Sequence, residues 1–203
     1  MPEHQRWEVS SIGVEQERIA GLEFKVGIFS NLTHDHLDYH KTFAEYLRCK
    51  KLFFDNLSPE AYAITNIDDR NGMVMMQNTK AQVVTYSCRK IADHTCRIIE
   101  QSFEGMLLRI DDRESWSCLI GMHNAYNLLA IYTTAVTLGA DPQEALVALS
   151  SLRPAPGRLE NIRAKARNNS LCSDNFSNME YASTERPEPF TQESPFVRTM
   201  VGR

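Results

Sequence analysis

The sequence has few cysteines, and their placement excludes a fold organised by disulfides or zinc. Neither a C-x-x-C pair nor any other zinc-ligand spacing occurs, and the number of cysteines is odd. The five are Cys49, Cys88, Cys96, Cys118 and Cys172. Scattered cysteines of this kind are typical of reduced thiols in a cytosolic protein.

An excess of basic residues and long apolar runs are also missing. The 22 lysines and arginines are outnumbered by 26 acidic residues, and the net charge is −4, so nothing favours binding to nucleic acid or to a membrane surface. The apolar runs are too short to cross a bilayer. The first residues, MPEHQRWEVSS, lack the basic-then-apolar pattern of an export signal. We therefore expect a soluble cytoplasmic protein, with neither nucleic acid nor a membrane as partner.

What is present is an alternation of apolar strands and amphipathic helices. Strands are predicted at 23–32, 61–69 and 81–87, and helices at 41–57 and within 72–79. Two antiparallel strands follow at 96–112 and 114–120, the first of which turns at Glu104-Gly105. Helices are then expected at 124–139, closed by Gly139, and from 142, with Asp141 as N-cap. This order predicts an α/β fold in which helices flank a parallel sheet, with a small antiparallel region.

The character of the chain changes after Glu160. Residues 165–203 show neither a strand period nor a helix period and are rich in Asn, Ser, Thr, Glu and Pro. Such a composition predicts a disordered tail without its own core. We therefore expect one domain at 1–160 and a tail at 161–203.

The apolar stripe of the helix at 41–57 contains a lysine. Lys50 lies between Tyr46 and Phe53 at helical spacing, whereas Lys51 lies off the stripe. One interpretation is that the side chain of Lys50 snorkels, with its stem packed and its ammonium in water. The other is that its amine lies in a pocket, where burial lowers the pKa. A neutral amine can react with dissolved CO2 to form a carbamate, an oxygen ligand suited to Mg2+.

Two further residues could complete a metal site with Lys50. His36, in THDHLD, follows an apolar strand and precedes Lys50 by fourteen residues, a distance that a loop and a helix can bridge. Glu8, in WEVSS, is expected at the end of a strand. Alone, the histidine cluster could belong to a surface loop and Glu8 could be an ordinary exposed carboxylate.

Two polar residues near the later helices could bind a ligand. Asn124, in GMHNAYN, could cap the helix that follows, or its amide could read the edge of a nucleobase. Arg158, in PAPGRLE, could be a surface arginine or a clamp on a phosphate.

Several motifs occur in a fixed order along residues 7–160. They are EVSS, Q.R.AGL.F, FSNLTHDHLDYH...Y...K..FF, N.DD..G, G.HN.YNLL and PGRLE. The series resembles the Mur ligases, and within them the group that adds the third amino acid of the peptidoglycan stem to UDP-N-acetylmuramoyl-L-alanyl-D-glutamate. The implied fold is most of the central ATPase domain of that family.

The resemblance implies an ATP- and Mg2+-dependent amide ligase, monomeric in the intact family, that acts through an acyl phosphate. Its partners would be the UDP-muramoyl-dipeptide and an amino acid, diaminopimelate or lysine. By position, the carbamylated lysine and the metal ligands correspond to Lys50, His36 and Glu8, with Lys50 and His36 at the catalytic centre. The substrate-binding positions are Ser10, Gln16 and Arg18, and the ATP-binding positions are Asn124 and Arg158.

The sequence also departs from the family. Ile12 stands where a histidine is usual, and no phosphate-loop motif G-x-x-x-x-G-K-[ST] occurs in the 203 residues. After PGRLE, the Asp-Tyr-Ala-His-Thr-Pro segment that opens the C-terminal domain is replaced by unrelated sequence, for which a shifted reading frame is one hypothesis. We therefore expect an incomplete ligase that does not turn over by itself. Rival interpretations are a non-catalytic paralogue or pseudogene product with at most a binding role, and a folylpolyglutamate- or cyanophycin-type ligase.

Overall fold

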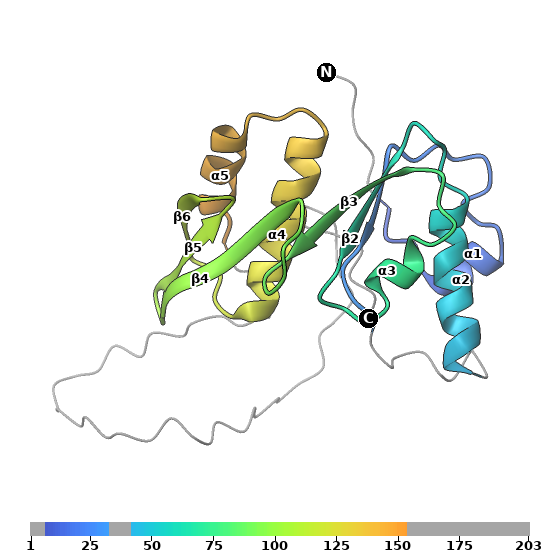
Figure 1. Cartoon of the computed structure of the whole chain (residues 1–203), viewed down its shortest axis with the longest axis horizontal. Coiled ribbons are helices and arrows are strands. Elements are labelled where there is room, and N and C mark those ends of the chain that lie inside the picture. Colours follow the sequence, from blue (N-terminus) through green and yellow to red (C-terminus); the bar gives the residue numbers. More distant parts are fainter. Residues whose placement is uncertain (1–6, 33–41, 154–203) are drawn as a thin grey trace, which may run out of the picture.

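The computed structural model describes residues 7–32 and 42–153, which form a six-stranded sheet with helices on both faces (Figure 1). The strands follow one another across the sheet in chain order: β1 (Val26–Phe29), β2 (Tyr62–Asn66), β3 (Gln82–Ser87), β4 (His94–Ser102), β5 (Gly105–Ile110) and β6 (Arg113–Ser117). Strands β1 to β4 are parallel, and β4 to β6 are antiparallel. The expected α/β class, with its small antiparallel region, is confirmed.

The helices divide between the two faces of the sheet. They are α1 (Ser11–Glu15), α2 (Phe43–Asp55), α3 (Gly72–Met75), α4 (Met122–Thr137) and α5 (Pro142–Ser150). In Figure 1, α1, α2 and α3 gather beside β1 and β2, whereas α4 and α5 lie on the other side of the molecule. Two apolar cores result, one under α2 and α3 and one under α4 and α5.

Strand β2 contributes to both cores. Ala63 packs in the core with α2 and α3, and its neighbour Ile64 packs in the core with α4. A parallel strand covered by helices on both faces needs apolar side chains at successive positions, which explains the near-continuous apolar run. On β1, Gly27 allows α2 to approach closely, because a Cβ there would lie 2.8 Å from the Phe53 ring.

Two of the predicted element ends are wrong, and a third is confirmed. Asn124 does not cap its helix, since α4 begins at Met122 after Gly121, whose φ of 93° suits glycine. The prediction that Glu8 ends a strand is also wrong: residues 7–10 form no strand, and Ser10 caps α1 by accepting a hydrogen bond from the N–H of Gly13 (3.0 Å). Asp141 caps α5 as expected, accepting from the N–H groups of Gln143 and Glu144.

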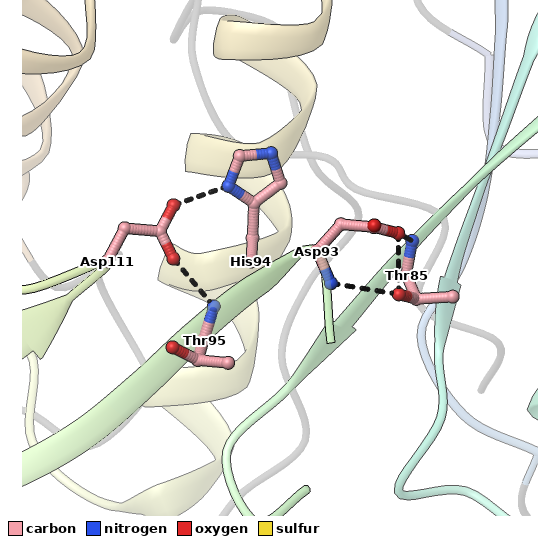
Figure 2. A network of polar contacts seen from close by, with 5 residues as sticks. All are labelled: Thr85, Asp93, His94, Thr95 and Asp111. Atoms are coloured by element: carbon pink, nitrogen blue, oxygen red, sulfur yellow. Dashed lines mark hydrogen bonds and ion pairs between the residues drawn. The ribbon is translucent and has the colours of Figure 1, made fainter. Parts of the chain in front are cut away.

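Strands β3 and β4 share only two register pairs, Tyr86 with His94 and Ser87 with Thr95. Side chains reinforce this short seam between the parallel and antiparallel parts of the sheet (Figure 2). The Asp93 carboxylate accepts hydrogen bonds from the N–H and the hydroxyl of Thr85 (2.8 and 2.7 Å). On the other side of β4, the Asp111 carboxylate just after β5 fixes the start of the strand, accepting from the N–H of Thr95 (2.8 Å) and pairing with Nδ1 of His94 (2.5 Å).

No helix within the described residues is both long enough and apolar enough to cross a membrane.

Candidate functional site

The carboxyl ends of β1, β2 and β3 are joined by polar side chains from the segment that follows β2. Asn66 donates from Nδ2 to the carbonyl of Ser30, just after β1, at 2.9 Å. Its Oδ1 accepts from the N–H of Asp68 at 3.0 Å. Asn66 therefore fixes the end of β2 to the end of β1, at the sheet edge where open α/β folds bind their ligands.

Asp68 joins β2 to β3 and to the first turn of α4. Its carboxylate accepts from the hydroxyl of Ser87 (2.8 Å), the N–H of Cys88 (2.8 Å) and the hydroxyl of Tyr126 (2.9 Å). Burial by itself would raise the pKa of Asp68, but the hydrogen bonds from Ser87, Tyr126 and Cys88 outweigh it, so the pKa lies below its usual value. Burial and the Asp68 carboxylate raise the pKa of Tyr126. Asp68 is thus held as a carboxylate at the centre of this edge.

Asp69 points back toward β1. Its carboxylate accepts from the N–H of Leu32 (3.1 Å) and from the N–H of Asn71 (2.7 Å). Leu32 is the last described residue before the segment 33–41, which contains His36. Asp69 therefore fixes the backbone at Leu32, shortly after the end of β1.

Lys50 lies partly buried on α2, with its Nζ 5.4 Å from the centre of the Tyr46 ring. Burial lowers the pKa of Lys50, and the nearby Glu8 carboxylate opposes that shift. Lys51, one residue further on, instead forms an ion pair with Asp55 at 2.6 Å. The two adjacent lysines therefore occupy different environments, and Lys50 has the one that favours a neutral amine.

Of the three expected metal ligands, Glu8, His36 and Lys50, the structure places Glu8 and Lys50 near each other. Glu8 is exposed and close enough to Lys50 for their charges to interact. His36 lies outside the described residues. Within 7–32 and 42–153, no three His, Cys, Asp or Glu side chains gather in a way that could hold a metal ion. A Mg2+ site here would depend on the modified Lys50 and on His36, and the carboxylate of Glu8 is a hard oxygen ligand of the kind that Mg2+ accepts.

The three expected substrate-binding residues lie on or just after α1. The hydroxyl of Ser10 caps this helix, Gln16 is its C-cap, and the N–H of Arg18 donates to the carbonyl of Gly13 (2.9 Å). All three residues are exposed. They share one short surface segment, so a single extended ligand could contact them together.

Asn124 lies in the first turn of α4, two residues before Tyr126. Its Nδ2 donates to the carbonyl of Ile120 at 2.8 Å. Because Tyr126 bonds Asp68, this turn of α4 is held at the carboxyl edge of the sheet. Arg158, the other expected ATP-binding residue, lies outside the described residues.

Sequence reasoning gave no role to Asp68, Ser87 or Tyr126, although they form the densest polar network at this edge. The N.DD..G and HN.YN strings contain Asp68 and Tyr126, so a signal was available. Interpreting these strings required the contact between Asp68 and Tyr126. The two residues lie 58 positions apart, and no local pattern reveals such a contact.

Comparison with known proteins supports one family. Residues 3–135 match the Mur ligase middle domain. The chain is 54% identical over 157 residues to the UDP-N-acetylmuramoyl-L-alanyl-D-glutamate–2,6-diaminopimelate ligase of Parabacteroides distasonis, and 55% identical over 157 residues to the protein of that name from Phocaeicola vulgatus. Each match covers 77% of this chain and 32% of the relative. The chain therefore spans about a third of the length of these relatives.

Solved structures show the same fold. MurF from Acinetobacter baumannii matches with a TM-score of 0.63 at 20% identity, over 70% of this chain and 32% of that one. MurF ligase from Thermotoga maritima, solved in complex with ADP, matches with a TM-score of 0.64 at 18% identity, over 78% and 37%. With the middle-domain match spanning most of the described sheet, the chain belongs to the Mur ligase family.

Proposed function

We propose that this chain supplies the central domain of a cytoplasmic, ATP-dependent ligase that joins 2,6-diaminopimelate to UDP-N-acetylmuramoyl-L-alanyl-D-glutamate. The names of relatives more than 50% identical support the substrates. The observation that carries the proposal is Lys50, a partly buried lysine whose pKa is lowered by burial and which interacts with Glu8. A lysine in this environment suits the carbamate that the Mur ligase resemblance implies.

The reaction forms one amide bond at the expense of ATP. The γ-phosphoryl group moves to the terminal carboxylate of the D-glutamate, the amine of the incoming amino acid attacks the acyl phosphate, and phosphate leaves. Transfer between anionic oxygens requires charge to be neutralised from fixed positions. Bound Mg2+ would supply that neutralisation. Glu8, His36 and the carbamate of Lys50 are the residues that would hold it.

The remaining site residues are assigned to the UDP-muramoyl-dipeptide and to ATP. Ser10, Gln16 and Arg18 would contact the UDP-muramoyl-dipeptide from the surface segment around α1. Arg158 would lie near the ATP phosphates. One N–H of the Asn124 amide donates to the carbonyl of Ile120 and orients the side chain, and its Oδ1 would accept a hydrogen bond from the amino group of adenine.

A non-catalytic binding role is the alternative. The 203 residues contain no G-x-x-x-x-G-K-[ST] sequence, whose backbone amides and lysine cradle nucleotide phosphates. The 203 residues taken alone lack this cradle, which should cost several kcal/mol (about 3 or more) of transition-state stabilisation. The isolated chain is therefore expected not to ligate, and ATP-dependent ligation by the purified chain would contradict this expectation.

A chimera separates the two functions. Residues 7–160 would replace the corresponding segment of the Parabacteroides distasonis ligase, which supplies the phosphate loop and the remaining domains. We expect the chimera to release phosphate only when ATP, Mg2+, the UDP-muramoyl-dipeptide and diaminopimelate are all present. Lys50→Met in the chimera should reduce the rate at least about 100-fold, because charge stabilisation at the transition state is lost. Lys51→Met is the matched control and should retain activity.

A folded chimera that binds the dipeptide but does not ligate would favour the non-catalytic role. A chimera whose activity survives Lys50→Met would refute the role proposed for that lysine.

A further inference from the structure

The end of β3 and the first half of β4 each carry a cysteine on the same face of the sheet. Cys88 directly follows β3, and Cys96 is the third residue of β4. The last register pairs of this seam are Tyr86 with His94 and Ser87 with Thr95. Continued by one residue, the register places Cys88 opposite Cys96.

Burial confirms that both side chains point toward α4. Side chains alternate between faces along a strand, so Cys88 shares a face with Tyr86, and Cys96 shares a face with Ile98. All four belong to the core under α4 or pack against it. The two thiols are close enough for Cys96 to raise the pKa of Cys88. Both cysteines are free, Cys96 is 1% exposed, and Cys88 is half-buried.

The geometry points to a latent disulfide: we propose that Cys88 and Cys96 form an oxidisable dithiol that closes across the β3–β4 seam. Adjacent strands lie about 4.8 Å apart, within the Cα separation of about 4.4–6.8 Å that a disulfide accepts. The bond would covalently join the parallel and antiparallel parts of the sheet, at the strand pair that has only two register pairs. It does not depend on ligase activity.

The chemistry proceeds by thiol–disulfide exchange with a small disulfide such as oxidised glutathione. The partly buried Cys88 attacks as its thiolate, forms a mixed disulfide and releases one reduced glutathione. The sulfur of Cys96 then attacks Cys88, closes the protein disulfide and releases the second glutathione. Two protein thiols are oxidised and one glutathione disulfide is reduced.

The surroundings make this exchange slow at neutral pH. The neighbouring Cys96, burial and the Asp68 carboxylate all raise the pKa of Cys88. Because the thiolate is the attacking form, the rate should increase with pH through the alkaline range. The site would therefore respond to sustained oxidation rather than to a brief pulse.

Peptide mapping tests the proposal directly. The reduced chain is incubated with oxidised glutathione at about pH 8.5, where thiolates become more populated, and its free thiols are alkylated. Trypsin then cuts after Arg89, Lys90 and Arg97, so the two cysteines fall in different peptides, AQVVTYSCR and IADHTCR. We expect these peptides to be recovered joined, and the oxidised chain to melt roughly 5 °C higher than the reduced one.

Variants and a denatured control complete the test. Cys118→Ser should leave the joined peptide unchanged, and Cys88→Ser should abolish it while Cys96 stays reduced in its core position. In urea, the Cys88–Cys96 selectivity should disappear among the five cysteines. Recovery of Cys88 as a stable glutathione adduct with Cys96 reduced would overturn the proposal. So would pairing of either cysteine with Cys49, Cys118 or Cys172 in the folded wild-type chain.

Discussion

At the scale of single residues, the adjacent lysines Lys50 and Lys51 have the same side chain but different environments. Lys50 faces the apolar side of α2 near Tyr46 and Glu8, and burial lowers its pKa. Lys51 forms an ion pair with Asp55, which lies one helical turn further along α2. The 100° rotation between successive helical residues gives the two side chains different neighbours: the amine of Lys51, whose side chain is 13% exposed, meets Asp55, and that of Lys50 lies near Tyr46 and Glu8.

The lowered pKa of Lys50 predicts a pH-dependent cost to stability. Below its folded-state pKa, the charged amine is held in a poorly solvated place. Between that pKa and the usual value of 10.5, the unfolded chain holds a proton that the folded chain does not, so folding becomes more favourable as pH rises. Lys50→Met should therefore raise the free energy of unfolding at about pH 7 by roughly 0.5–1 kcal/mol, and the gain should fade by about pH 10.

Urea unfolding at the two pH values measures this effect, with Lys51→Met as the matched control. Lys51→Met removes the same charge but breaks the bond to Asp55, so it should bring no gain at either pH. An equal gain for both variants would show that net charge, and not the position of Lys50, is responsible.

At the scale of elements, Asp68 joins β2, β3 and α4. Tyr126→Phe should destabilise the chain by about 1 kcal/mol, and Asp68→Asn by about 1–3 kcal/mol, because donors around the carboxylate lose their acceptor. The pKa of Asp68 lies below its usual 3.8, so its contribution is full above 3.8 and is lost as pH falls through the folded-state pKa. The cost of Asp68→Asn should therefore shrink in acid.

A double-mutant cycle with Tyr126→Phe and Asp68→Asn isolates the bond between the two residues. The effects of the single variants should sum to more than that of the double variant, since both remove the same contact. Strict additivity would mean that Tyr126 does not stabilise the chain through Asp68.

The packing of α3 under β2 depends on Gly72. A Cβ at this position would lie 2.0 Å from the carbonyl oxygen of Asn66, and the carbonyl of Gly72 itself accepts from the hydroxyl of Thr65 (2.9 Å). Gly72→Ala should therefore cost about 2–4 kcal/mol, because backbone must move to admit the methyl group. Thermal unfolding measures this cost.

Gly139→Ala provides the comparison for Gly72→Ala. Gly139 has a φ of 92°, but an added methyl group there would meet no atom within 4 Å. Its substitution therefore adds backbone strain alone and should cost about 1 kcal/mol. A cost at Gly72 no greater than that at Gly139 would contradict the steric explanation.

For the molecule as a whole, the sequence predicts the layers better than the connections between them. Alternation and apolar runs predicted the parallel strands, and the Glu104-Gly105 turn predicted the hairpin, in which Ser102 pairs with Gly105. The five-residue α1 was missed because it is shorter than two helical periods. Gly121, not Asn124, is the N-cap of α4, because backbone conformation, not side-chain type, determined that end.

In the candidate site, too, local features could be predicted from the sequence and long-range contacts could not. The environment of Lys50 could be anticipated, since its place on the apolar stripe is a local property of one helix. The Asp68 network could not, since it joins segments that only the folded sheet brings together. The roles of Glu8, His36, Ser10, Gln16, Arg18, Asn124 and Arg158 stay predictions from family resemblance.

Carbamylation of Lys50 can be measured on the folded chain itself. The wild type, Lys50→Met and Lys51→Met would be incubated with carbon-13-labelled bicarbonate and examined by native mass spectrometry and carbon NMR. We expect a labile adduct of one CO2 and a carbamate signal in the wild type and in Lys51→Met, and neither in Lys50→Met. An unmodified wild-type chain, or an adduct that persists in Lys50→Met, would contradict the claim that this amine becomes a carbamate able to bind a metal.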